Sequence, residues 1–445
     1  MAKTNGEEVI PGARRLIKSL RDMGYDFAAA VADLVDNSIE AGATSVAIDI
    51  EFDGDDSWVR IADNGHGMTT SALREAMRYG AEREYDPDDL GKFGLGLKTA
   101  SLSQCQRLSV ASRCNRDRAD IAAFCWDLDH IEKSNRWEIL PLERNVLGPT
   151  IRGPLKDTVG TVVLWQRLDR ILGFKHPYGE FARRRLSTMC RDLEQHLGMV
   201  FHRFLAGKIR AKRLKLFVNG NEVEHWDPFA SNEPHTRKLE HVTLEVVQDG
   251  VKGQVLLEPY VLPPQDKFSA PEAHSRASGP EKWNRQQGFY IYRAGRMIQS
   301  GGWCNLRTLD EHTKLARVAL SFSPRLDEAF KINVAKMRVQ LPTQIREEIE
   351  KAIGPVIKVA QAAYRKSGDS AGKSHVEGAA EKTTTGGAHA NVEDSKATKT
   401  KADGKAWTFD EISTRIERAA KPSERPVVVR VLDRVRRTIA DLEPA

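Results

Sequence analysis

In the segment 25–41 the apolar residues recur at three- and four-residue spacing, which predicts an amphipathic helix. The repeating apolar positions are Ala28, Val31, Leu34, Val35 and Ile39. Asp33 and Asn37 lie on a different stripe of this helix, one turn apart. Gly42 follows the last periodic position, where a helix commonly ends. A shorter helix is expected over 13–23.

Alternating apolar and polar residues predict strands in the stretch that follows. They cover 46–52 and 57–62, with Asp63 at the end of the second strand, and then 108–112, 119–127 and 160–166. Short helices are expected over 69–80 and 97–102. A sheet with helices on one face buries both kinds of pattern, so residues 1–168 are expected to form a two-layer α/β sandwich.

The pattern changes near Leu168, and a second α/β domain is expected over 169–345. Its predicted helices are 181–205 and a short one over 325–331, and its predicted strands are 214–217, 239–247, 254–261, 288–298, 318–322 and 334–341. The segment 263–280 is rich in Pro, Ser and Ala and is expected to be a long loop. A helical pattern over 344–364 predicts a connecting helix, assigned to 346–365.

The C-terminal part of the chain has a different composition. Residues 366–405 contain no aromatic residue and no Ile, Leu or Met, and their seven Lys nearly balance six Asp and Glu. Such a segment cannot bury a core, so a disordered linker is expected. A capping box at Thr408 and an apolar stripe over 428–442 predict a short helical tail over 406–445, which docks on another surface or another copy. The predicted fold class is therefore α+β.

Composition narrows the class of protein. With 445 residues, 40% hydrophobic, 29% charged and a mean hydropathy of −0.48, the chain fits a soluble protein of two or three domains. No apolar run approaches the roughly 20 residues that cross a membrane, and residues 1–12 lack the apolar core of a signal peptide. Five cysteines without a Cys-x-x-Cys pair argue against a disulfide framework or a zinc ribbon. We therefore expect a cytoplasmic protein with reduced thiols.

The net charge of +6 is unevenly distributed. The segment 170–215 contains 12 Lys and Arg but 3 Asp and Glu. A basic segment of this kind binds nucleic acid or another polyanion, although a solvated helix face has the same composition.

Candidate chemistry is concentrated in three polar blocks, at 32–43, 63–68 and 91–101. In the first, Asn37 offers a neutral oxygen to Mg²⁺, which keeps most of its waters and needs one or two protein oxygens. Asp33, one turn earlier, is placed to hold a water as a general base. A solvated polar face on a surface helix would also contain Asn37 and Asp33. These two residues alone therefore do not establish a Mg²⁺ site.

The second block places Asp63 beside a loop that contains Gly65 and Gly67. A carboxylate accepts a hydrogen bond from an exocyclic amine such as that of adenine, and glycine lets the backbone approach a ligand closely. An ordinary Asp-Asn-Gly turn has the same letters. This block alone is therefore a weak signal.

The third block has Gly91, Gly94 and Gly96 just before a helical segment, where successive backbone amides hold phosphate oxygens. Lys98 adds a point charge for the phosphates. The chain has no Gly-x-x-x-x-Gly-Lys-Ser/Thr loop, so this is not a Walker site. The order and spacing of the three blocks together predict one ATP site.

The three blocks resemble the N-box and the two glycine boxes of the GHKL (Bergerat-fold) ATPases, which comprise gyrase B subunits, ninety-kilodalton heat-shock chaperones, histidine kinases and MutL. Residues 36–43 resemble MutL and gyrase most. Residues 94–99, taken with 160–165, are similar to the MORC branch and its bacterial relatives. In the second domain, 333–339 resembles the MutL stretch whose lysine reaches the γ-phosphate, and 288–296 resembles the preceding transducer strand and turn.

This resemblance covers roughly residues 20–345 and implies a role for several site residues. It implies that Asn37 binds Mg²⁺, that Asp63 binds the adenine amine, that Thr161 binds adenine through water, and that Lys336 contacts the γ-phosphate. The segment 82–101 is implied to be a lid over ATP, and the second domain to be a transducer of the ribosomal S5 type. The other residues expected at the nucleotide are Gly65, Gly67, Met68, Gly91, Lys92, Gly94, Leu95, Gly96, Leu97 and Lys98.

One position departs from the family pattern. Hydrolytic members have Glu where this chain has Asp33, whose side chain is one methylene shorter. A carboxylate about 1 Å too far from its water lowers the rate on the order of a hundredfold, so we expect ATP binding with slow hydrolysis.

Three functions remain open. The first is a slow ATPase that dimerises on ATP binding and clamps double-stranded DNA through 170–215. The second is a chaperone-like clamp on protein clients. The third is a non-hydrolysing, ATP-gated scaffold whose protein partner binds the tail 406–445. A histidine kinase is disfavoured because no phosphoacceptor helix pair precedes the expected ATP domain.

Overall fold

The computed structural model describes residues 9–377 except 23, 81–95, 117–119, 144, 146, 174–175, 177, 210–212, 249, 334–335 and 337–338, and it also describes Leu432. The chain divides into two units, Met1–Ala380 and Glu381–Ala445. The linker and tail predicted over 378–445 lie outside the described residues, Leu432 apart.

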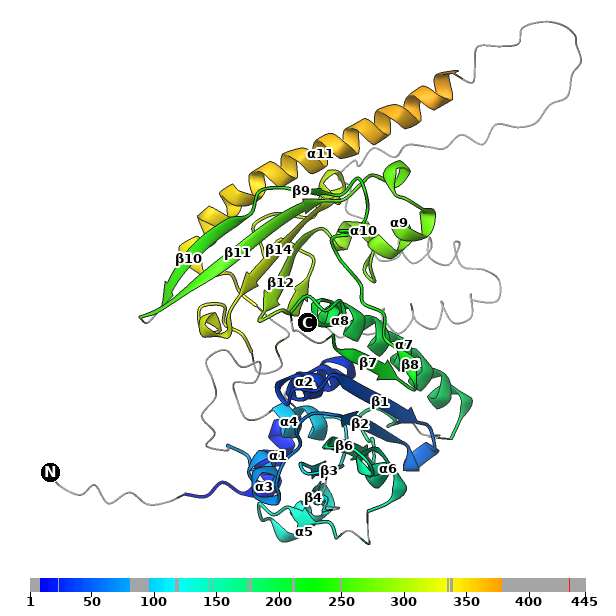
Figure 1. Cartoon of the computed structure of the whole chain (residues 1–445), viewed down its shortest axis with the longest axis vertical. Helices are drawn as coiled ribbons and strands as arrows, with labels where there is room; N and C mark the ends of the chain where they lie inside the picture. The colour runs from blue at the N-terminus through cyan, green and yellow to red at the C-terminus, as the bar shows by residue number, and fades with distance from the viewer. Residues whose placement is uncertain are drawn as a thin grey trace, which may run out of the picture. The chain divides into compact units, whose positions relative to one another are not determined.

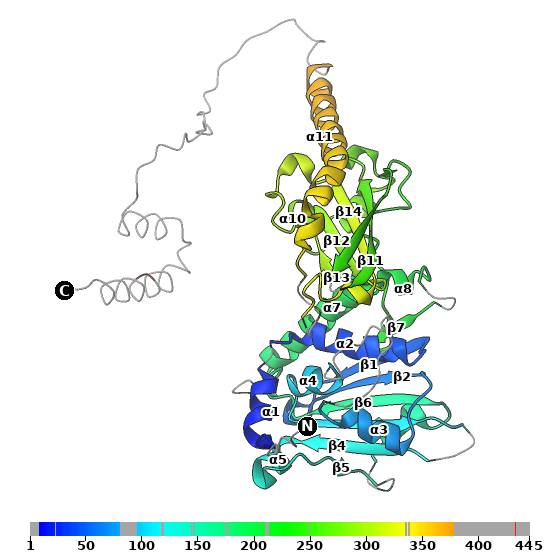
Figure 2. The ribbon, with the colours of Figure 1, turned by 90° about the vertical axis from the view of Figure 1, so that its left-hand side faces the viewer.

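Eight strands of the described chain form a first sheet in the order β5-β4-β3-β6-β2-β1-β7-β8 (Figures 1 and 2). Their bounds are β1 (Ser45–Glu51), β2 (Trp58–Asp63), β3 (Arg107–Arg113), β4 (Ala122–Asp127), β5 (Leu140–Pro141), β6 (Gly160–Gln166), β7 (Lys215–Val218) and β8 (Asn221–Glu222). Among these described strands, β1 and β7 form the one parallel pair. Asp63 of β2 lies opposite Thr161 of β6, so the register brings two predicted site residues together.

Helices pack on this sheet through a large apolar core. The helices are α1 (Ala13–Arg21), α2 (Phe27–Glu40), α3 (Thr70–Met77), α4 (Gly96–Leu102), α5 (Leu128–Ser134), α6 (Pro149–Arg152), α7 (Glu180–Val200) and α8 (His202–Leu205), with the 3₁₀ helices η1 (Gly54–Asp56) and η2 (Gly153–Leu155). The apolar stripe of α2 is buried in this core, as its periodicity predicts. A smaller core, built with Ile151 of α6 and Leu155 of η2, covers part of the opposite face.

The strands β7 and β8 follow residue 168, where the first domain was expected to end, yet they extend the first sheet. β7 pairs with β1, and Leu186, Leu193 and Leu197 of α7 belong to the same apolar core as α2. The predicted helix over 181–205 ends at Val200, and α8 follows it.

The second sheet has the order β10-β11-β14-β12-β13, and β9 pairs with β11. Its strands are β9 (Arg237–Lys238), β10 (Val242–Gln248), β11 (Val251–Val261), β12 (Gly288–Arg293), β13 (Arg296–Ser300) and β14 (Ala316–Phe322). Its helices are α9 (Pro271–Ala277), α10 (Lys282–Arg285) and α11 (Arg346–Glu377), with η3 (Gln265–Lys267), η4 (Glu311–Thr313), η5 (Pro324–Leu326) and η6 (Thr343–Ile345). The predicted α+β class, with two sheets, is confirmed.

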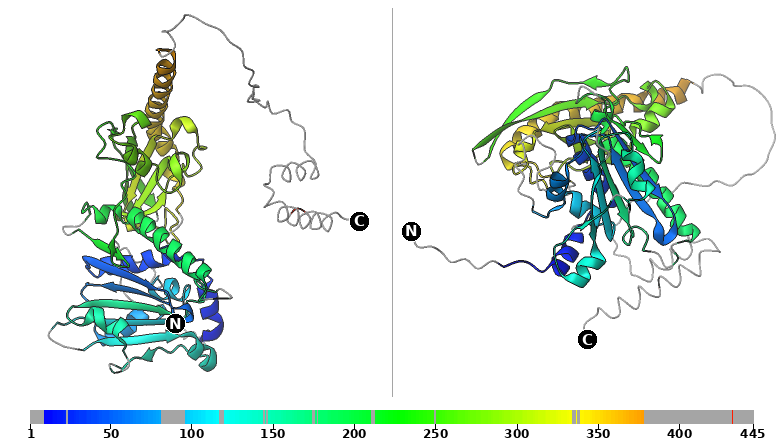
Figure 3. Two further views of the ribbon diagram at one scale, coloured as in Figure 1. Left: turned by 90° about the vertical axis from the view of Figure 1, so that its right-hand side faces the viewer. Right: turned by 60° about the horizontal axis from the view of Figure 1, so that its bottom comes forward.

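The long helix α11 covers the second sheet (Figures 1 and 3). Ile349, Ile353, Val356 and Ile357 of α11 are buried in one core with Val255 and other residues of the strands. The helix runs to Glu377, past residue 366 where the disordered linker was expected to begin. Among the described residues, no helix is long and apolar enough to span a membrane.

Two segments differ from the sequence prediction. The predicted strand over 288–298 is a hairpin, because Ala294 and Gly295 adopt φ values of 47° and 85° and turn the chain between β12 and β13. The predicted loop over 263–280 contains η3 and α9. Pro271 stands at the start of α9, where a missing amide hydrogen costs nothing, so this proline begins a helix instead of marking a loop.

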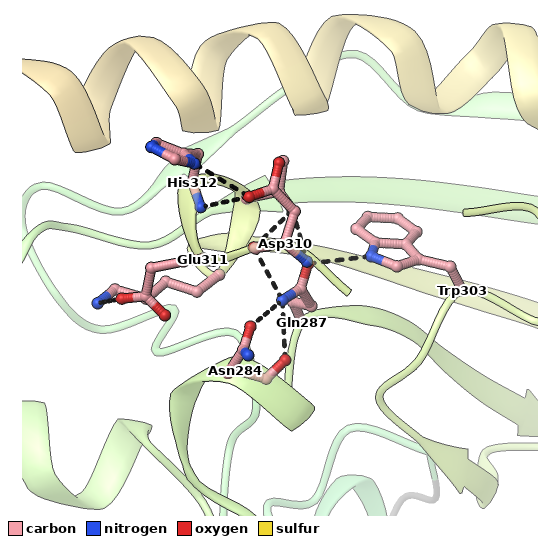
Figure 4. A network of polar contacts seen from close by, with 8 residues as sticks. Asn284, Gln287, Trp303, Asp310, Glu311 and His312 are labelled. Atoms are coloured by element: carbon pink, nitrogen blue, oxygen red, sulfur yellow. Dashed lines mark hydrogen bonds and ion pairs between the residues drawn. The ribbon is translucent and has the colours of Figure 1, made fainter. Parts of the chain in front are cut away.

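A buried glutamine ties the loops at one end of the second sheet together (Figure 4). The side-chain oxygen Oε1 of Gln287 accepts hydrogen bonds from Trp303 Nε1 at 3.1 Å, Thr313 Oγ1 at 2.6 Å and the Asp310 backbone amide at 3.3 Å. The side-chain nitrogen Nε2 of Gln287 donates to Asn284 and to the Asp310 carbonyl oxygen. One side chain therefore connects α10, β12 and the segment 303–313.

Candidate functional site

The helix α2 supplies the first group of candidate site residues. Its N-terminus is capped by Asp26, whose carboxylate accepts from the Ala29 amide at 2.7 Å. The cap and the apolar stripe fix the rotation of the helix. Asn37 is exposed, whereas Asp33 and Asp36 are buried, at 3% and 0% exposure. The helix ends at Glu40, and Gly42 takes a φ of 73°, as predicted for a C-terminal glycine.

Asp63, at the end of β2, is held by three hydrogen bonds. Its Oδ1 accepts from the Gly65 amide at 2.8 Å and from the Thr161 amide at 3.2 Å. Its Oδ2 accepts from Ser38 Oγ, on α2, at 3.1 Å. A carboxylate has about four acceptor positions, so Oδ2 retains capacity for one more donor. Burial raises the pKa of Asp63 above its usual value, and these three hydrogen bonds offset part of that rise.

The loop after β2 approaches its neighbours closely. A Cβ atom on Gly65 would lie 2.7 Å from the Cβ of Ala41, and one on Gly67 would lie 2.1 Å from the Arg113 carbonyl oxygen. Gly67 also has a φ of 67°, a conformation that favours glycine. Both glycines are therefore required for the chain to pass between the end of α2 and β3.

Ser112 of β3 links this loop to Thr161. The Met68 amide donates to Ser112 Oγ at 2.8 Å, and the same hydroxyl lies 3.0 Å from Thr161 Oγ1 and donates to the Gly160 carbonyl oxygen at 3.0 Å. Asp63, Thr161, Ser112 and Met68 are thus joined in one polar network at the ends of β2, β3 and β6.

The helix α4 begins at Gly96, next to α2. A Cβ on Gly96 would lie 3.6 Å from Asp33 Oδ2, so the start of α4 is in contact range of that carboxylate. Leu97 is partly buried against the first core. The Lys98 side chain is 2% exposed, and its ammonium donates to the Ala76 carbonyl oxygen at 3.0 Å, at the end of α3. The predicted site residues Gly91, Lys92, Gly94 and Leu95, and the lid up to residue 95, lie outside the described residues.

Asp33 and Asp36 meet two cations from segments that follow the first sheet in sequence. Lys336 Nζ lies 2.7 Å from Asp36 Oδ2 and 3.6 Å from Asp33 Oδ1. Arg296 of β13 lies 3.0 Å from Asp36 Oδ2 through Nε and 3.5 Å from Asp33 Oδ1 through Nη2. Tyr25 Oη donates to Asp33 Oδ2 at 2.8 Å. Lys336 is therefore a buried, ion-paired residue at 8% exposure, and the described residues of the predicted strand 334–341 form no strand.

The described residues fit the nucleotide expected from the sequence in three respects. Asp63 Oδ2 has capacity for an amine donor, Asn37 presents its amide to solvent on α2, and Asp33 Oδ1 is buried without a hydrogen-bond partner. Among the described residues, no cluster of three or more His, Cys, Asp or Glu side chains offers a metal site. A single Asn oxygen is compatible with Mg²⁺, which retains most of its water ligands.

Comparison with known proteins agrees with this geometry. Residues 25–161 match the family model described as histidine kinase-, DNA gyrase B-, and HSP90-like ATPase. Residues 25–161 carry a GHKL-type ATPase domain. The matched range contains α2, Asp63, the loop with Gly65 and Gly67, α4 and Thr161, which carry most of the predicted site residues described above.

Several relatives of this chain are DNA mismatch repair proteins named MutL. The protein of Haemophilus influenzae is 28% identical over 236 residues, which is 52% of this chain and 33% of the relative. That of Pasteurella multocida is 29% identical over 220 residues, 48% of this chain and 31% of the relative. That of Rippkaea orientalis is 41% identical over 96 residues, 20% of this chain and 17% of the relative. The chain spans no more than a third of the length of these relatives.

Four residues that contact the predicted site residues were not predicted from the sequence. Ser38 of α2 touches Asp63 and Ser112 of β3 touches Thr161, and a serine gives no signal until the packing of α2 on β2 and the pairing of β3 with β6 are known. Tyr25 was predicted as the first residue of a helix, and its hydrogen bond to Asp33 was not predicted. Arg296 ends the stretch 288–296 that resembles a transducer strand, and no pattern in that stretch pointed to α2.

Proposed function

We propose that this protein binds Mg·ATP at the site formed by α2, Asp63 and Thr161, and hydrolyses the ATP slowly. The observation that carries the proposal is the half-buried Asp63 carboxylate, held by Gly65, Ser38 and Thr161 with one acceptor position left. That arrangement suits an exocyclic amine next to a backbone loop. The match of residues 25–161 to an ATPase family supports it independently.

Each residue of the network has a proposed task. Asp63 accepts the adenine amine, Thr161 contacts adenine through water, and Gly65, Gly67 and Met68 shape the loop beside the base. Asn37 holds Mg²⁺, which supplies charge neutralisation at the phosphates when bound. Asp33 orients the attacking water, and Lys336 contacts the γ-phosphate. We propose the segment 82–101 as the lid that closes over ATP, with its glycines at 91–96 and Lys98 around the phosphates.

We further propose that ATP binding drives dimerisation of a clamp that acts on DNA in the cytoplasm. The MutL relatives are named as DNA mismatch repair proteins, which supports a DNA role. Within the basic segment 170–215, Arg183, Arg184, Arg185 and Arg191 of α7 are exposed, and Arg184 also pairs with Glu180 at 3.1 Å. Several exposed arginines on one helix suit a phosphate backbone.

A second candidate is an ATP-gated scaffold without turnover. Asp33 is 3% exposed, one methylene shorter than the usual Glu, and held by Tyr25 while two cations lie near its other oxygen. A carboxylate restrained in this way activates water poorly if the ion pairs persist with ATP bound. The tail 406–445 is then the proposed partner-binding segment.

The test is steady-state ATP hydrolysis with Mg²⁺, with and without double-stranded DNA, for wild type, Asn37→Ala and Asp33→Ala. Hydrolysis that depends on both residues and changes with DNA supports the clamp. Tight ATP binding without turnover under either condition refutes the ATPase and supports the scaffold. DNA binding that weakens steeply with salt distinguishes phosphate contacts from a protein client.

A further inference from the structure

Four buried, charged side chains meet where α2 faces the segments that carry Arg296 and Lys336. Asp33 and Asp36 come from α2, Arg296 from β13 and Lys336 from the segment between η5 and η6, and each is 8% exposed or less. Two carboxylates and two cations leave this cluster without net charge. His196 of α7 adds no third cation, because burial and the charge of Arg296 lower the pKa of His196 to about 4.

Both cations of the cluster reach both carboxylates. Lys336 is nearest to Asp36 Oδ2, at 2.7 Å, and Arg296 Nε approaches the same oxygen to 3.0 Å. Asp33 Oδ1 lies 3.6 Å from Lys336 and 3.5 Å from Arg296, and its other oxygen accepts from Tyr25. Asp36 is therefore the main counter-ion of Lys336, and Arg296 duplicates that contact.

The duplication matters once Lys336 has a second task. An ammonium that moves to a γ-phosphate leaves Asp36, and a buried carboxylate without a cation is strongly unfavourable. Arg296 stays on β13, packed with its guanidinium 5.9 Å from the centroid of the Phe201 ring. Because its fork spans Asp36 with Nε and Asp33 with Nη2, it can hold both carboxylates alone.

We propose that Arg296 is a positioning residue that keeps Asp36 and Asp33 neutralised, and thereby frees Lys336 to contact the γ-phosphate. This inference rests on the proposed ATP site. It places a second cation of the transducer-like part in the nucleotide response, acting through Asp36 and not on the nucleotide itself.

The readout is the ratio of the dissociation constants of Mg·ADP and Mg·ATP, measured by isothermal titration calorimetry. One charge-assisted contact from Lys336 is expected to favour ATP over ADP by about tenfold or more in the wild type. Arg296→Gln is expected to reduce that preference about tenfold, to the level of Lys336→Met, with little change in ADP affinity. Arg296→Lys is expected to restore part of it.

Two variants separate positioning from general stability. Arg296→Gln/Asp36→Asn removes the carboxylate that holds Lys336, so the ATP preference is expected to return. Arg293, on the same hairpin as Arg296, forms a buried ion pair at 2.7 Å with Asp327, which follows η5, so Arg293→Gln is expected to lower Tm without changing the ratio. The inference is overturned if Arg296→Gln keeps the wild-type ratio, if Asp36→Asn fails to restore it, or if the wild type does not prefer ATP. Absence of any ATP binding by the wild type refutes the proposed function itself.

Discussion

Lys98 is a buried lysine on α4 whose surroundings make a quantitative prediction. Its side chain is 2% exposed, its ammonium donates to the Ala76 carbonyl oxygen at 3.0 Å, and it lies 5.8 Å from the centroid of the Tyr79 ring. Burial lowers the pKa of Lys98 from 10.5 to about 8, although the Glu75 carboxylate raises it in part. The charged ammonium is therefore less stable in the folded chain than in the unfolded chain.

We predict that replacing Lys98 by Met changes how stability depends on pH. Between pH 8 and 10.5 the unfolded chain binds the Lys98 proton more tightly than the folded chain, so wild-type stability rises with pH in that window. The full shift corresponds to about 3 kcal/mol, at about 1.4 kcal/mol per pKa unit. The free energy of unfolding of Lys98→Met minus that of the wild type should therefore fall by about 2 kcal/mol from pH 7 to pH 9.5. The variant also loses the hydrogen bond to Ala76, which lowers this difference equally at both pH values. The test is therefore the change of the difference with pH.

The assay is urea unfolding at the two pH values, followed by the fluorescence of the buried Trp126 and Trp165. The exposed Lys133→Met serves as the control for general effects of alkali. A gap between Lys98→Met and wild type that is the same at both pH values would refute the buried placement of the ammonium. The ATP affinity of Lys98→Met is a second test. It should stay close to that of the wild type, because a lysine whose ammonium donates to the Ala76 carbonyl oxygen contributes little to phosphate binding.

Three further predictions follow from the contacts. Gly67→Ala should lower the free energy of unfolding by about 3 kcal/mol or more, because its Cβ would meet the Arg113 carbonyl oxygen. Gly80→Ala should cost about 1 kcal/mol, because Gly80 has the same φ of 67° and no described atom lies within 4 Å of the added Cβ. Equal losses in urea unfolding would contradict the clash with Arg113. Gln287→Leu should cost about 2–4 kcal/mol because buried donors lose their shared acceptor (Figure 4), and a loss no larger than that of the exposed Gln254→Leu would count against it. Replacing the arginines 183–185 by Gln should reduce the salt slope of double-stranded DNA binding by about three, and an unchanged slope in fluorescence anisotropy would remove α7 from the interface.

The residue pattern predicted the strands β1, β2, β3, β4, β6 and β7 of the first sheet, but not the two-residue strands β5 and β8. The stripe of α2, the strand β6 over 160–166 and the position of Asp63 at a strand end all agree with the structure. Alternation cannot tell which strands are neighbours, so the pairing of β7 with β1 across the expected domain boundary was not predictable. The α9 helix was missed because Pro and Ser were read as loop residues.

The candidate site was predictable where a single element carries the residues in order. Asp33 and Asn37 share α2, and Asp63 precedes its glycines in one loop. Contacts made by folding were not predictable: Ser112 reaches Thr161 through strand pairing, and Arg296 and Lys336 reach Asp36 from segments about 260 and 300 residues away in sequence. The exposure of Asn37 beside the burial of Asp36 likewise depends on what packs against α2.

The central claim is that Asp63 recognises the adenine of ATP. The most direct measurement is calorimetric binding of Mg·ATP and Mg·GTP to wild type and Asp63→Asn, with Asp49→Asn as the control. Asp49 is a carboxylate of β1 in the same sheet, paired with Arg60 at 2.8 Å. We expect the wild type and Asp49→Asn to bind ATP and to prefer it to GTP, because guanine offers no amine at the same position. Asp63→Asn should lose about tenfold or more of the ATP affinity, and with it the preference, at an unchanged Tm. Wild-type binding of ATP that Asp63→Asn leaves intact, or no ATP binding at all, would contradict the account.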